Sequence, residues 1–418
     1  MTRSRRAGAP DPSAGRARAR NVVGACACAL AMLVAHPARS EPTVRPTLLA
    51  EADARAFRAP VEGRTGFALA RFRPGAVFQP LSWFRAAGTV ELVPTPTILD
   101  AFANLRVSEW LDVEIGQSRP PLFASFRYQQ VHTLPFPDRA PLVLAMRVRR
   151  DVGISAHLAH ARVPFESWIR IGSGSGNNVT RAASRPALYG LFDLVLGRAN
   201  AGATGNELLG LRAGVSGMTE IVDEREGISG ISPTGFVYHR PVIASGPRVV
   251  GEAHVISYVG PVRGTFEAAV GREARALDAD GNPETARAPL PSVTSSGISA
   301  ELAWTLRGRP RTVGRAPIAE DDSSLGALEL AARYDALALG RGAPDVVGGG
   351  YRGGALSLKW YALPFAALTA AGYAGVYDVG PLEDPQRTDT YTFLLRASFY
   401  WIPLGTLNQR PAAVPTPR

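Results

Sequence analysis

Residues 297–308 have the sequence GISAELAWTLRG, and this stretch decides the fold. Apolar side chains occupy every second position from Ile298 to Leu306, whereas the positions between them include Glu301 and Arg307. Successive side chains of a β-strand point to opposite faces. The alternation therefore predicts a strand with one apolar face and one charged face.

The same alternation recurs along the C-terminal third of the chain. It covers residues 328–334, 356–361 and 390–401, and aromatic side chains such as Trp360 and Trp401 lie near the ends of these segments. An apolar face on every strand needs an apolar surrounding, and aromatic residues near strand ends are typical of strands that cross a bilayer. We therefore predict that the apolar faces contact lipid.

Residues 1–40 have the pattern of an export signal. Six arginines precede a short apolar run over 21–35, and small residues follow at 38–40. A basic region, an apolar region and a small-residue cleavage site define a secretory signal peptide, so we predict cleavage before Glu41. A lipoprotein signal with Cys26 as the lipidated residue is the alternative, but its apolar run would be shorter than such signals require.

Cysteine and charge are both concentrated in this predicted leader. Cys26 and Cys28 are the two cysteines of the chain, so the mature protein would contain no thiol, which excludes disulfides and cysteine-bound metals. Much of the formal net charge of +10 also belongs to the leader. The remaining basic residues are arginines, with Lys359 as the single lysine of the sequence.

The chain after residue 40 contains nothing close to the ~20 consecutive apolar residues of a transmembrane helix. An exported chain without such a helix can be soluble, periplasmic or a closed barrel. Its length of about 378 residues, at roughly 20–24 residues per strand with its connection, corresponds to about 16–18 strands. We predict an all-β fold, a transmembrane antiparallel β-barrel of about 16 strands with long extracellular loops and short periplasmic turns.

This prediction divides the chain into four parts. They are a signal peptide (1–40), a periplasmic lead-in (41–64), the outer-membrane β-barrel (65–402) and a C-terminal tail (403–418). Within the barrel, residues 142–149 are predicted to form a strand, and the glycine-rich residues 340–354 are predicted to form a loop.

Few residues have the spacing that catalysis or metal binding requires. Residues 278–284 place several oxygen ligands close together, as calcium requires, but the full twelve-residue ligand order is missing and the same residue types form ordinary turns. The six histidines are spread singly, without the spacing of a metal site or a catalytic triad. We therefore predict no enzyme activity, no cofactor and no metal site, and an exported chain with interspersed acids is not expected to bind nucleic acid.

Charged side chains on the second face of the strands are the candidate functional residues, because they would project into a water-filled lumen and set its potential. On the predicted strand 142–149, Arg147 and Arg149 share a face that cannot contact lipid, where an arginine costs roughly 2–4 kcal/mol. A solvated turn is the alternative for this pair. The other candidate pore-lining residues are Glu301, Arg307, Glu329, Arg333, Lys359 and Arg396. Both signs occur, so these charges either set ion selectivity or neutralise neighbours across the wall.

Several segments of the chain together resemble the sequence of a known protein family. They are the strand 301–308, the segment GALELAARYD at 326–335, the segment LSLKWY at 356–361 and a closing strand with Arg396 and Phe399, together with short upstream segments at 99–102, 113–121 and 246–252. Together they resemble the phosphate-selective porin O/P family. The chain departs from that family where Lys359 replaces the usual Asn, and where residues 400–418 extend past the usual terminal Phe.

The resemblance implies a 16-stranded, homotrimeric channel in the bacterial outer membrane, surrounded by outer-membrane lipid. Such a channel serves the passive diffusion of small inorganic anions such as phosphate or polyphosphate. Two alternatives are a non-conducting outer-membrane barrel whose loops bind a partner and, less favoured by the histidine spacing, an outer-membrane hydrolase.

Overall fold

The computed structural model describes most of the chain after residue 42. The described residues are 43–58, 65–160, 162–174, 176, 185–197, 209–232, 236–277, 288–310, 316–317, 319, 325–379 and 386–401. The predicted signal peptide (1–40), the predicted C-terminal tail (403–418) and the calcium candidate at 278–284 all lie outside these ranges.

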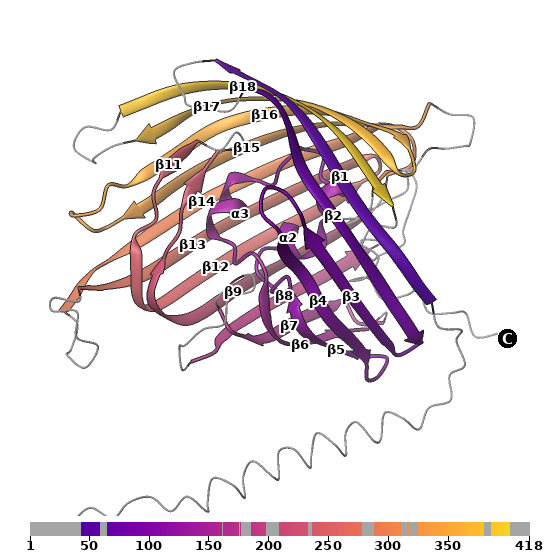
Figure 1. Ribbon diagram of the computed structural model, residues 1–418, viewed down its shortest axis with the longest axis horizontal. Helices are drawn as coiled ribbons and strands as arrows, with labels where there is room; N and C mark the ends of the chain where they lie inside the picture. Colours follow the sequence, from indigo (N-terminus) through magenta and orange to yellow (C-terminus); the bar gives the residue numbers. More distant parts are fainter. Residues whose placement is uncertain are drawn as a thin grey trace, which may run out of the picture.

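Sixteen described strands form one closed antiparallel barrel (Figure 1). The first eight are β1 (Thr43–Arg58), β2 (Gly66–Leu81), β3 (Phe84–Glu91), β4 (Thr97–Arg106), β5 (Leu111–Ser118), β6 (Asp151–Ala159), β7 (Phe165–Gly172) and β8 (Ala187–Gly197). The second eight are β9 (Leu209–Glu226), β12 (Ile243–Val259), β13 (Val262–Leu277), β14 (Ala288–Arg307), β15 (Ala327–Arg341), β16 (Gly349–Leu363), β17 (Ala366–Val379) and β18 (Gln386–Trp401). Each strand pairs with its neighbours in the chain, and β1 closes the barrel against β18. The predicted fold class is confirmed.

The two faces of the wall follow the alternation of the sequence. In β14, the Leu302 and Trp304 side chains point outward and are 55% and 48% exposed, whereas Ser299 and Thr305 point inward and are 5% and 7% exposed. The outer surface is therefore apolar and the lumen polar, as a barrel in lipid requires.

The two ends of the barrel differ. At one end, two-residue turns at 82–83, 260–261 and 364–365 connect neighbouring strands, although the connection 308–326 at this end is long. Exposed tryptophans gather near this end, namely Trp110, Trp304, Trp360 and Trp401. Such a row of aromatic residues is typical of a membrane interface.

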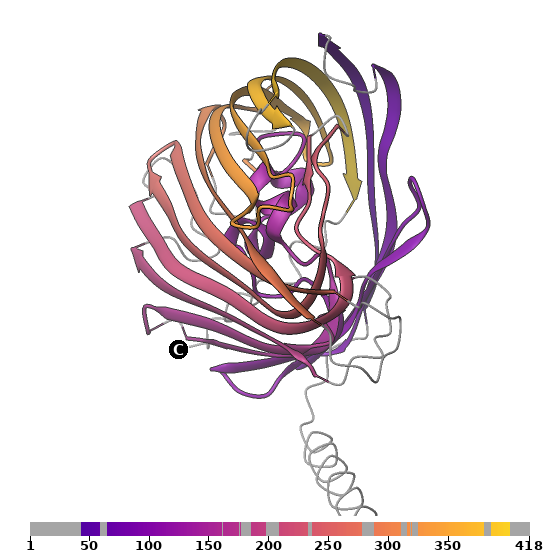
Figure 2. The ribbon, with the colours of Figure 1, turned by 90° about the vertical axis from the view of Figure 1, so that its left-hand side faces the viewer.

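Two connections at the other end fold into the barrel (Figure 2). The longer, residues 119–150, is called the inward segment below; it contains α2 (Ala124–Tyr128), the 3₁₀ helix η1 (Val131–Thr133) and α3 (Pro141–Met146). The other, residues 227–242, contains a two-stranded sheet of β10 (Gly230–Ile231) and β11 (Val237–His239). Helix α3 contacts β10, β14 and β15, so the inward segment leans on that side of the wall.

The main apolar core lies inside the barrel, between the inward segment and the wall. Phe123, Phe126 and Leu142 of the inward segment are almost completely buried, and they belong to one cluster with Tyr351 and Tyr377 of the wall. No helix in the described ranges is long and apolar enough to cross a membrane.

The predicted lead-in at 41–64 is wrong, because residues 43–58 form strand β1 of the barrel. The strand does alternate. Glu51 and Asp53 point inward and are 2% exposed, and Ala50, Ala52 and Ala54 occupy the alternate positions. Alanine is only weakly apolar, and Pro46 within the strand is unfavourable in a β-ladder, so the pattern is faint.

The predicted strand at 142–149 is also wrong. Residues 141–146 form helix α3, with Pro141 in its first turn, where a missing N–H costs nothing. A short continuous apolar run is compatible with either a buried helix or a buried strand, so periodicity could not decide. The predicted glycine-rich loop is shorter than expected, because β15 extends to Arg341 and β16 begins at Gly349.

Candidate functional site in the barrel lumen

The inward segment is held to the wall by carboxylates at its helix α2. The backbone N–H and the hydroxyl of Ser125 both donate to the Glu267 carboxylate of β13, at 2.8 Å each. At the other end of the helix, the Tyr128 hydroxyl donates to Asp193 of β8 at 2.6 Å. All four side chains lie inside the barrel, so these bonds fix where the segment crosses the lumen.

A second tether involves the only lysine of the sequence. The Lys359 Nζ atom donates to the carbonyl oxygens of His132 and Leu134 at 2.7 and 2.8 Å. Beside it, the Ser357 hydroxyl donates to the carbonyl oxygen of Pro135 at 2.7 Å. Strand β16 therefore supplies three hydrogen bonds to carbonyl groups of η1 and of the two residues that follow it.

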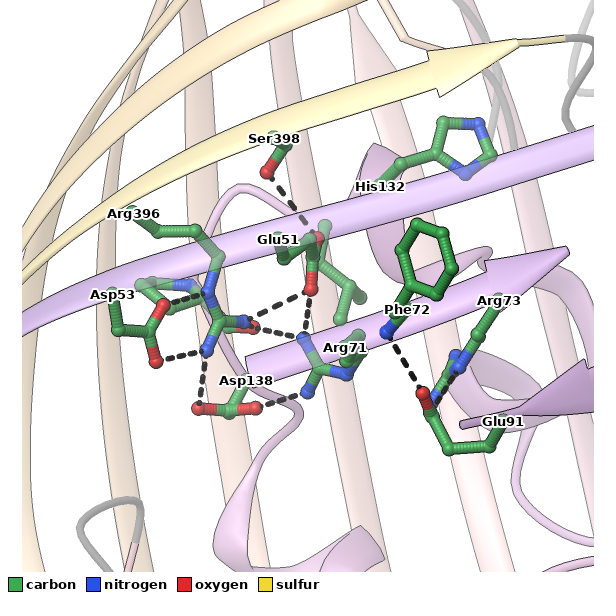
Figure 3. A network of polar contacts seen from close by, with 12 residues as sticks. Glu51, Asp53, Arg71, Phe72, Arg73, Glu91, His132, Asp138, Arg396 and Ser398 are labelled. Atoms are coloured by element: carbon green, nitrogen blue, oxygen red, sulfur yellow. Dashed lines mark hydrogen bonds and ion pairs between the residues drawn. The ribbon is translucent and has the colours of Figure 1, made fainter. Parts of the chain in front are cut away.

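A buried network of charges closes the barrel seam between β1 and β18 (Figure 3). Arg396 donates to both oxygens of Asp53, at 2.6 and 2.8 Å. Arg71 of β2 bridges Glu51 to Asp138 of the inward segment, and an Asp138 oxygen lies 3.6 Å from Arg396. Arg55 also pairs with Asp53 at 2.6 Å, so three arginines are matched by three carboxylates and this network ties the segment down without excess positive charge.

Four arginines surround one phenylalanine of the inward segment. The guanidinium carbons of Arg119, Arg139, Arg147 and Arg150 lie 5.6, 5.1, 4.7 and 5.8 Å from the centre of the Phe126 ring. Cations are attracted to the electron-rich face of an aromatic ring, which makes such positions favourable for guanidinium groups. The ring therefore gathers positive charge at one place in the lumen.

Only one of these arginines has a carboxylate partner among the described residues. Arg150 pairs with Asp100 at 3.0 and 3.3 Å. Arg119 and Arg139 donate instead to neutral oxygens of the inward segment. Burial, followed by repulsion from Arg150 and other arginines, lowers the pKa of Arg147 to about 9. The cluster therefore carries positive charge that its own surroundings do not neutralise.

Access of water divides the lumen into two sides. The Arg71, Arg73 and Arg106 side chains of β2 and β4 are 16%, 18% and 35% exposed. On the opposite wall and at the seam, the side chains of Arg170 and Arg396 are only 0% and 2% exposed. Among these inward arginines, those of β2 and β4 are thus the more accessible to water.

Two predicted pore-lining residues, Arg147 and Arg149, lie on the inward segment and not on a strand. Arg147 is half-buried beside Phe126, and Arg149 is exposed. The prediction that they share a strand face is wrong, because residues 141–146 form helix α3 and no strand covers Arg147 and Arg149. Both nevertheless lie in the connection that enters the lumen.

Three other candidates face the lumen from the strands. Arg263 lies between Glu301 and Glu329, at 3.5 and 3.9 Å, and Arg333 pairs with Asp335 at 2.8 Å. All five side chains are nearly buried. These contacts agree with the alternative that inward charges neutralise one another across the wall, with Arg263 as a partner that sequence reasoning missed.

Arg307 lies at the end of β14, at the rim of the barrel. It donates to the carbonyl oxygens of Gly326 and Leu325 at 3.1 and 2.8 Å, across the entrance to β15. Its contacts with the described residues are to backbone atoms at a half-buried position, so it holds the strand end.

Sequence reasoning also missed the arginines of the accessible side. Arg71 and Arg73 belong to a strand in which apolar residues occupy both faces, and a bulge between Glu51 and Ala52 shifts the pairing of β1 with β2. Arg119 precedes Pro120 and Pro121, a pair that is typical of a turn or loop. The only available signal was the density of arginine in residues 119–150.

A chain of serine, carboxylate and imidazole groups in the lumen is relevant to the hydrolase alternative. The Ser216 hydroxyl donates to Glu252 at 2.6 Å, and the two nitrogens of His254 contact Glu252 and Asp193 at 3.1 and 2.7 Å. Both imidazole nitrogens are occupied by carboxylates, so the ring is not available as a base for this serine. Among the described residues, no group of three or more His, Cys, Asp or Glu could hold a metal ion.

Comparison with solved structures shows where this fold occurs. An outer-membrane OmpT of Vibrio cholerae has 11% identity and a TM-score of 0.55, covering 87% of this chain and 99% of its own. The outer-membrane channel DcaP of Acinetobacter baumannii has 10% identity and a TM-score of 0.54, covering 88% and 99%. An anion-selective porin from Comamonas acidovorans has 9% identity and a TM-score of 0.54, covering 86% and 100%.

These similarities establish a shared fold, that of outer-membrane β-barrels, over nearly the whole length of each protein. No known family profile matches the chain, and no curated protein matches its sequence. The resemblance to the phosphate-selective porin O/P family therefore stays a prediction.

Proposed function

We propose that this protein is a porin of the bacterial outer membrane through which small inorganic anions diffuse passively. The observation that carries the proposal is the group of arginines around Phe126, three of which have no carboxylate partner among the described residues. These arginines belong to the segment that crosses the lumen, whereas Arg71, Arg73 and Arg106 of the wall are each paired with a carboxylate. Rings or ladders of arginine favour anions in a pore.

The preference for anions follows from which charges lack a counter-charge. Neutral carbonyl oxygens, to which Arg119 and Arg139 donate, carry no charge that would neutralise a guanidinium. Its field is screened only beyond roughly 8 Å at physiological ionic strength, so in a narrow lumen it acts on every passing ion. The planar fork of arginine also suits phosphate, the permeant that the sequence resemblance implies.

Among the eight predicted pore-lining residues, we assign Arg147 and Arg149 to the permeation path. Their exposure and their place on the inward segment support this assignment. Lys359, Arg333 and Arg396 instead hold the inward segment by its carbonyl groups.

The outer surface supports the proposed location and assembly. The apolar outer face and the tryptophan row suit a bilayer. We further propose export by cleavage of residues 1–40 and assembly into a homotrimer; the OmpT of Vibrio cholerae folded in vitro is described as a trimer form. Chemical crosslinking of the purified protein tests the trimer, and N-terminal sequencing tests cleavage before Glu41.

Planar-bilayer recording tests the channel. A purified barrel in a tenfold KCl gradient should give stepwise conductance. Its reversal potential should have the sign expected for an anion-selective channel, and a perfectly selective channel would give a magnitude of about 59 mV. Replacing both Arg147 and Arg149 by Glu should move this potential toward the cation side. Arg162→Glu, in the exposed turn between β6 and β7, is the control and should leave it unchanged. A cation-selective wild type contradicts the anion preference.

A non-conducting barrel is the second candidate, and one observation favours it. On the wall opposite β1–β5, inward charges such as Arg170, Asp193 and His254 are almost fully buried, so the inward segment seals much of the lumen. If the folded protein inserts into bilayers without conductance, and deletion of residues 120–149 produces conductance, the barrel is plugged and the porin proposal is wrong.

A further inference from the structure

Three neighbouring strands form a polar notch on the lumen side of the wall. Thr47 of β1, Gly75 of β2 and Thr89 of β3 pair directly with one another across the sheet. Because Gly75 has no side chain, the two threonine hydroxyls can approach each other across it, where even a methyl group would be crowded by them and by the carbonyl oxygen of Gly88 at 2.5 Å. A methyl group at Gly75 would lie 2.7 Å from the Thr47 hydroxyl oxygen and 3.0 Å from that of Thr89.

Among the residues that the structure describes, the hydroxyl groups at this notch have no hydrogen-bond partner. The Thr47 and Thr89 residues are 6% and 3% exposed, and neither hydroxyl oxygen is bonded to another group. A buried hydroxyl without a partner costs about 1–3 kcal/mol, so such groups are normally satisfied by a bound molecule. Two of them that line one small cavity indicate an occupant that accepts hydrogen bonds from both.

A small cavity connects the notch to the inward segment. It has a volume of about 40 Å³ and is lined by both threonines, by Arg73 of β2, and by Arg119 and Arg150 of the inward segment. A water-sized particle needs roughly 10–15 Å³ of such volume, so the cavity holds about three or four such particles. A monatomic anion with one or two waters fits this volume, whereas a hydrated polyatomic anion does not.

The charge around the cavity is positive. Arg150 is paired with Asp100, and Arg73 is paired with Glu91, whereas in the described part of the chain Arg119 donates only to uncharged oxygens. Three guanidinium groups thus face two carboxylates. Burial, together with the positive charge of Arg150, holds the pKa of Arg119 well below its usual range, which an anion beside it would relieve.

We propose that this cavity binds a halide ion, chloride in the cell, which receives hydrogen bonds from the Thr47 and Thr89 hydroxyls and lies against Arg119. The ion links strands β1–β3 to the inward segment and therefore stabilises its position in the lumen. The site does not depend on conduction, because it concerns an ion held beside the wall and not one that passes through.

Thermal unfolding of the folded barrel in detergent tests the site. Sodium bromide or chloride replaces sodium gluconate at constant sodium concentration. The midpoint of the wild type should rise with halide and saturate. Thr47→Val and Thr89→Val keep the shape of the side chain but remove the donor, so each should weaken the apparent halide affinity about tenfold.

The control for these variants is Thr265→Val. Thr265 of β13 is another buried threonine whose hydroxyl has no partner, but it does not line this cavity. Its replacement should leave the halide response unchanged. In gluconate, Thr47→Val should be no less stable than the wild type, because the hydroxyl then has no ligand to lose.

Crystals grown in bromide give the direct measurement. An anomalous peak between the Thr47 and Thr89 hydroxyls is expected, and it should vanish in the Thr47→Val/Thr89→Val double variant. The proposal is wrong if no peak lies in the notch, or if the wild type and Thr47→Val respond equally to halide. It is also wrong if inorganic phosphate stabilises the protein more strongly and saturably than bromide.

Discussion

Lys359→Met should release the inward segment from strand β16. The Lys359 ammonium group is buried and donates to the carbonyl oxygens of His132 and Leu134. Methionine has a similar length and fills the same space but cannot donate. The variant loses two hydrogen bonds from a charged donor, each worth about 1.5–3 kcal/mol. Part of this free energy is regained, because the variant no longer has to remove an ammonium group from water and bury it. We expect a net loss of about 3 kcal/mol.

This loss should be local and measurable by hydrogen exchange. The backbone N–H groups of Thr133 and Leu134 are bonded within η1, so they exchange only when the segment opens. A change of about 3 kcal/mol corresponds to roughly 150-fold faster exchange of peptides covering residues 131–138. Exchange in β16 itself should change little, because its ladder hydrogen bonds are intact.

The matched control is Arg307→Met. Arg307 also donates to two backbone carbonyl oxygens, but at the exposed rim, where water replaces the lost donor. A surface change of this kind is usually within about 0.5 kcal/mol. If exchange at residues 131–138 in Lys359→Met stays within threefold of the wild type, the tether assigned to Lys359 is refuted.

Three further predictions concern the lumen. Arg396→Glu places a carboxylate beside Asp53 and should destabilise the barrel by about 3–5 kcal/mol, seen as a lower folded yield; a well-folded variant with altered selectivity would contradict the buried network. Phe126→Ala removes the ring that gathers four arginines and should lower the unfolding free energy by about 3–5 kcal/mol in denaturant titration. Burial lowers the pKa of His132 to about 3 from an ordinary 6.5, so its contribution to stability is complete above pH 6.5 and is lost as the pH falls toward 3. His132→Phe should therefore reduce the acid sensitivity of unfolding between pH 6 and 4, by at most about 1.4 kcal/mol per pH unit, and an equal slope in both proteins would contradict the neutral imidazole.

The wall of the barrel was predictable because lipid imposes a simple rule on it. Every outward position must be apolar, so Leu302 and Trp304 mark their face without knowledge of any neighbour. The rule weakens where small residues satisfy it. Strand β1 alternates Ala with Glu51, Asp53 and Arg55, and alanine alone did not distinguish a lipid-facing row from an irregular segment.

The interior was not predictable in the same way, because its contacts join residues that are far apart in the chain. Ser125 and its partner Glu267 are separated by 142 residues, and His132 and Lys359 by 227. No local pattern records such a pair. The sequence indicated that Lys359 and Arg396 face inward, but it did not show that their partners are carbonyl groups of a folded segment and not permeating ions.

These partners divide the lumen charges into two kinds. A cation matched by carboxylates, such as Arg396 with Asp53, contributes stability but little net field, because the opposite charges cancel within a few ångströms. A cation that donates to neutral oxygens, such as Arg119 or Arg139, is satisfied as a donor while its charge remains. The same bonds that fold the inward segment therefore leave its positive charge in place, and a substitution that adds a carboxylate beside Arg119 should weaken anion preference without loosening the segment.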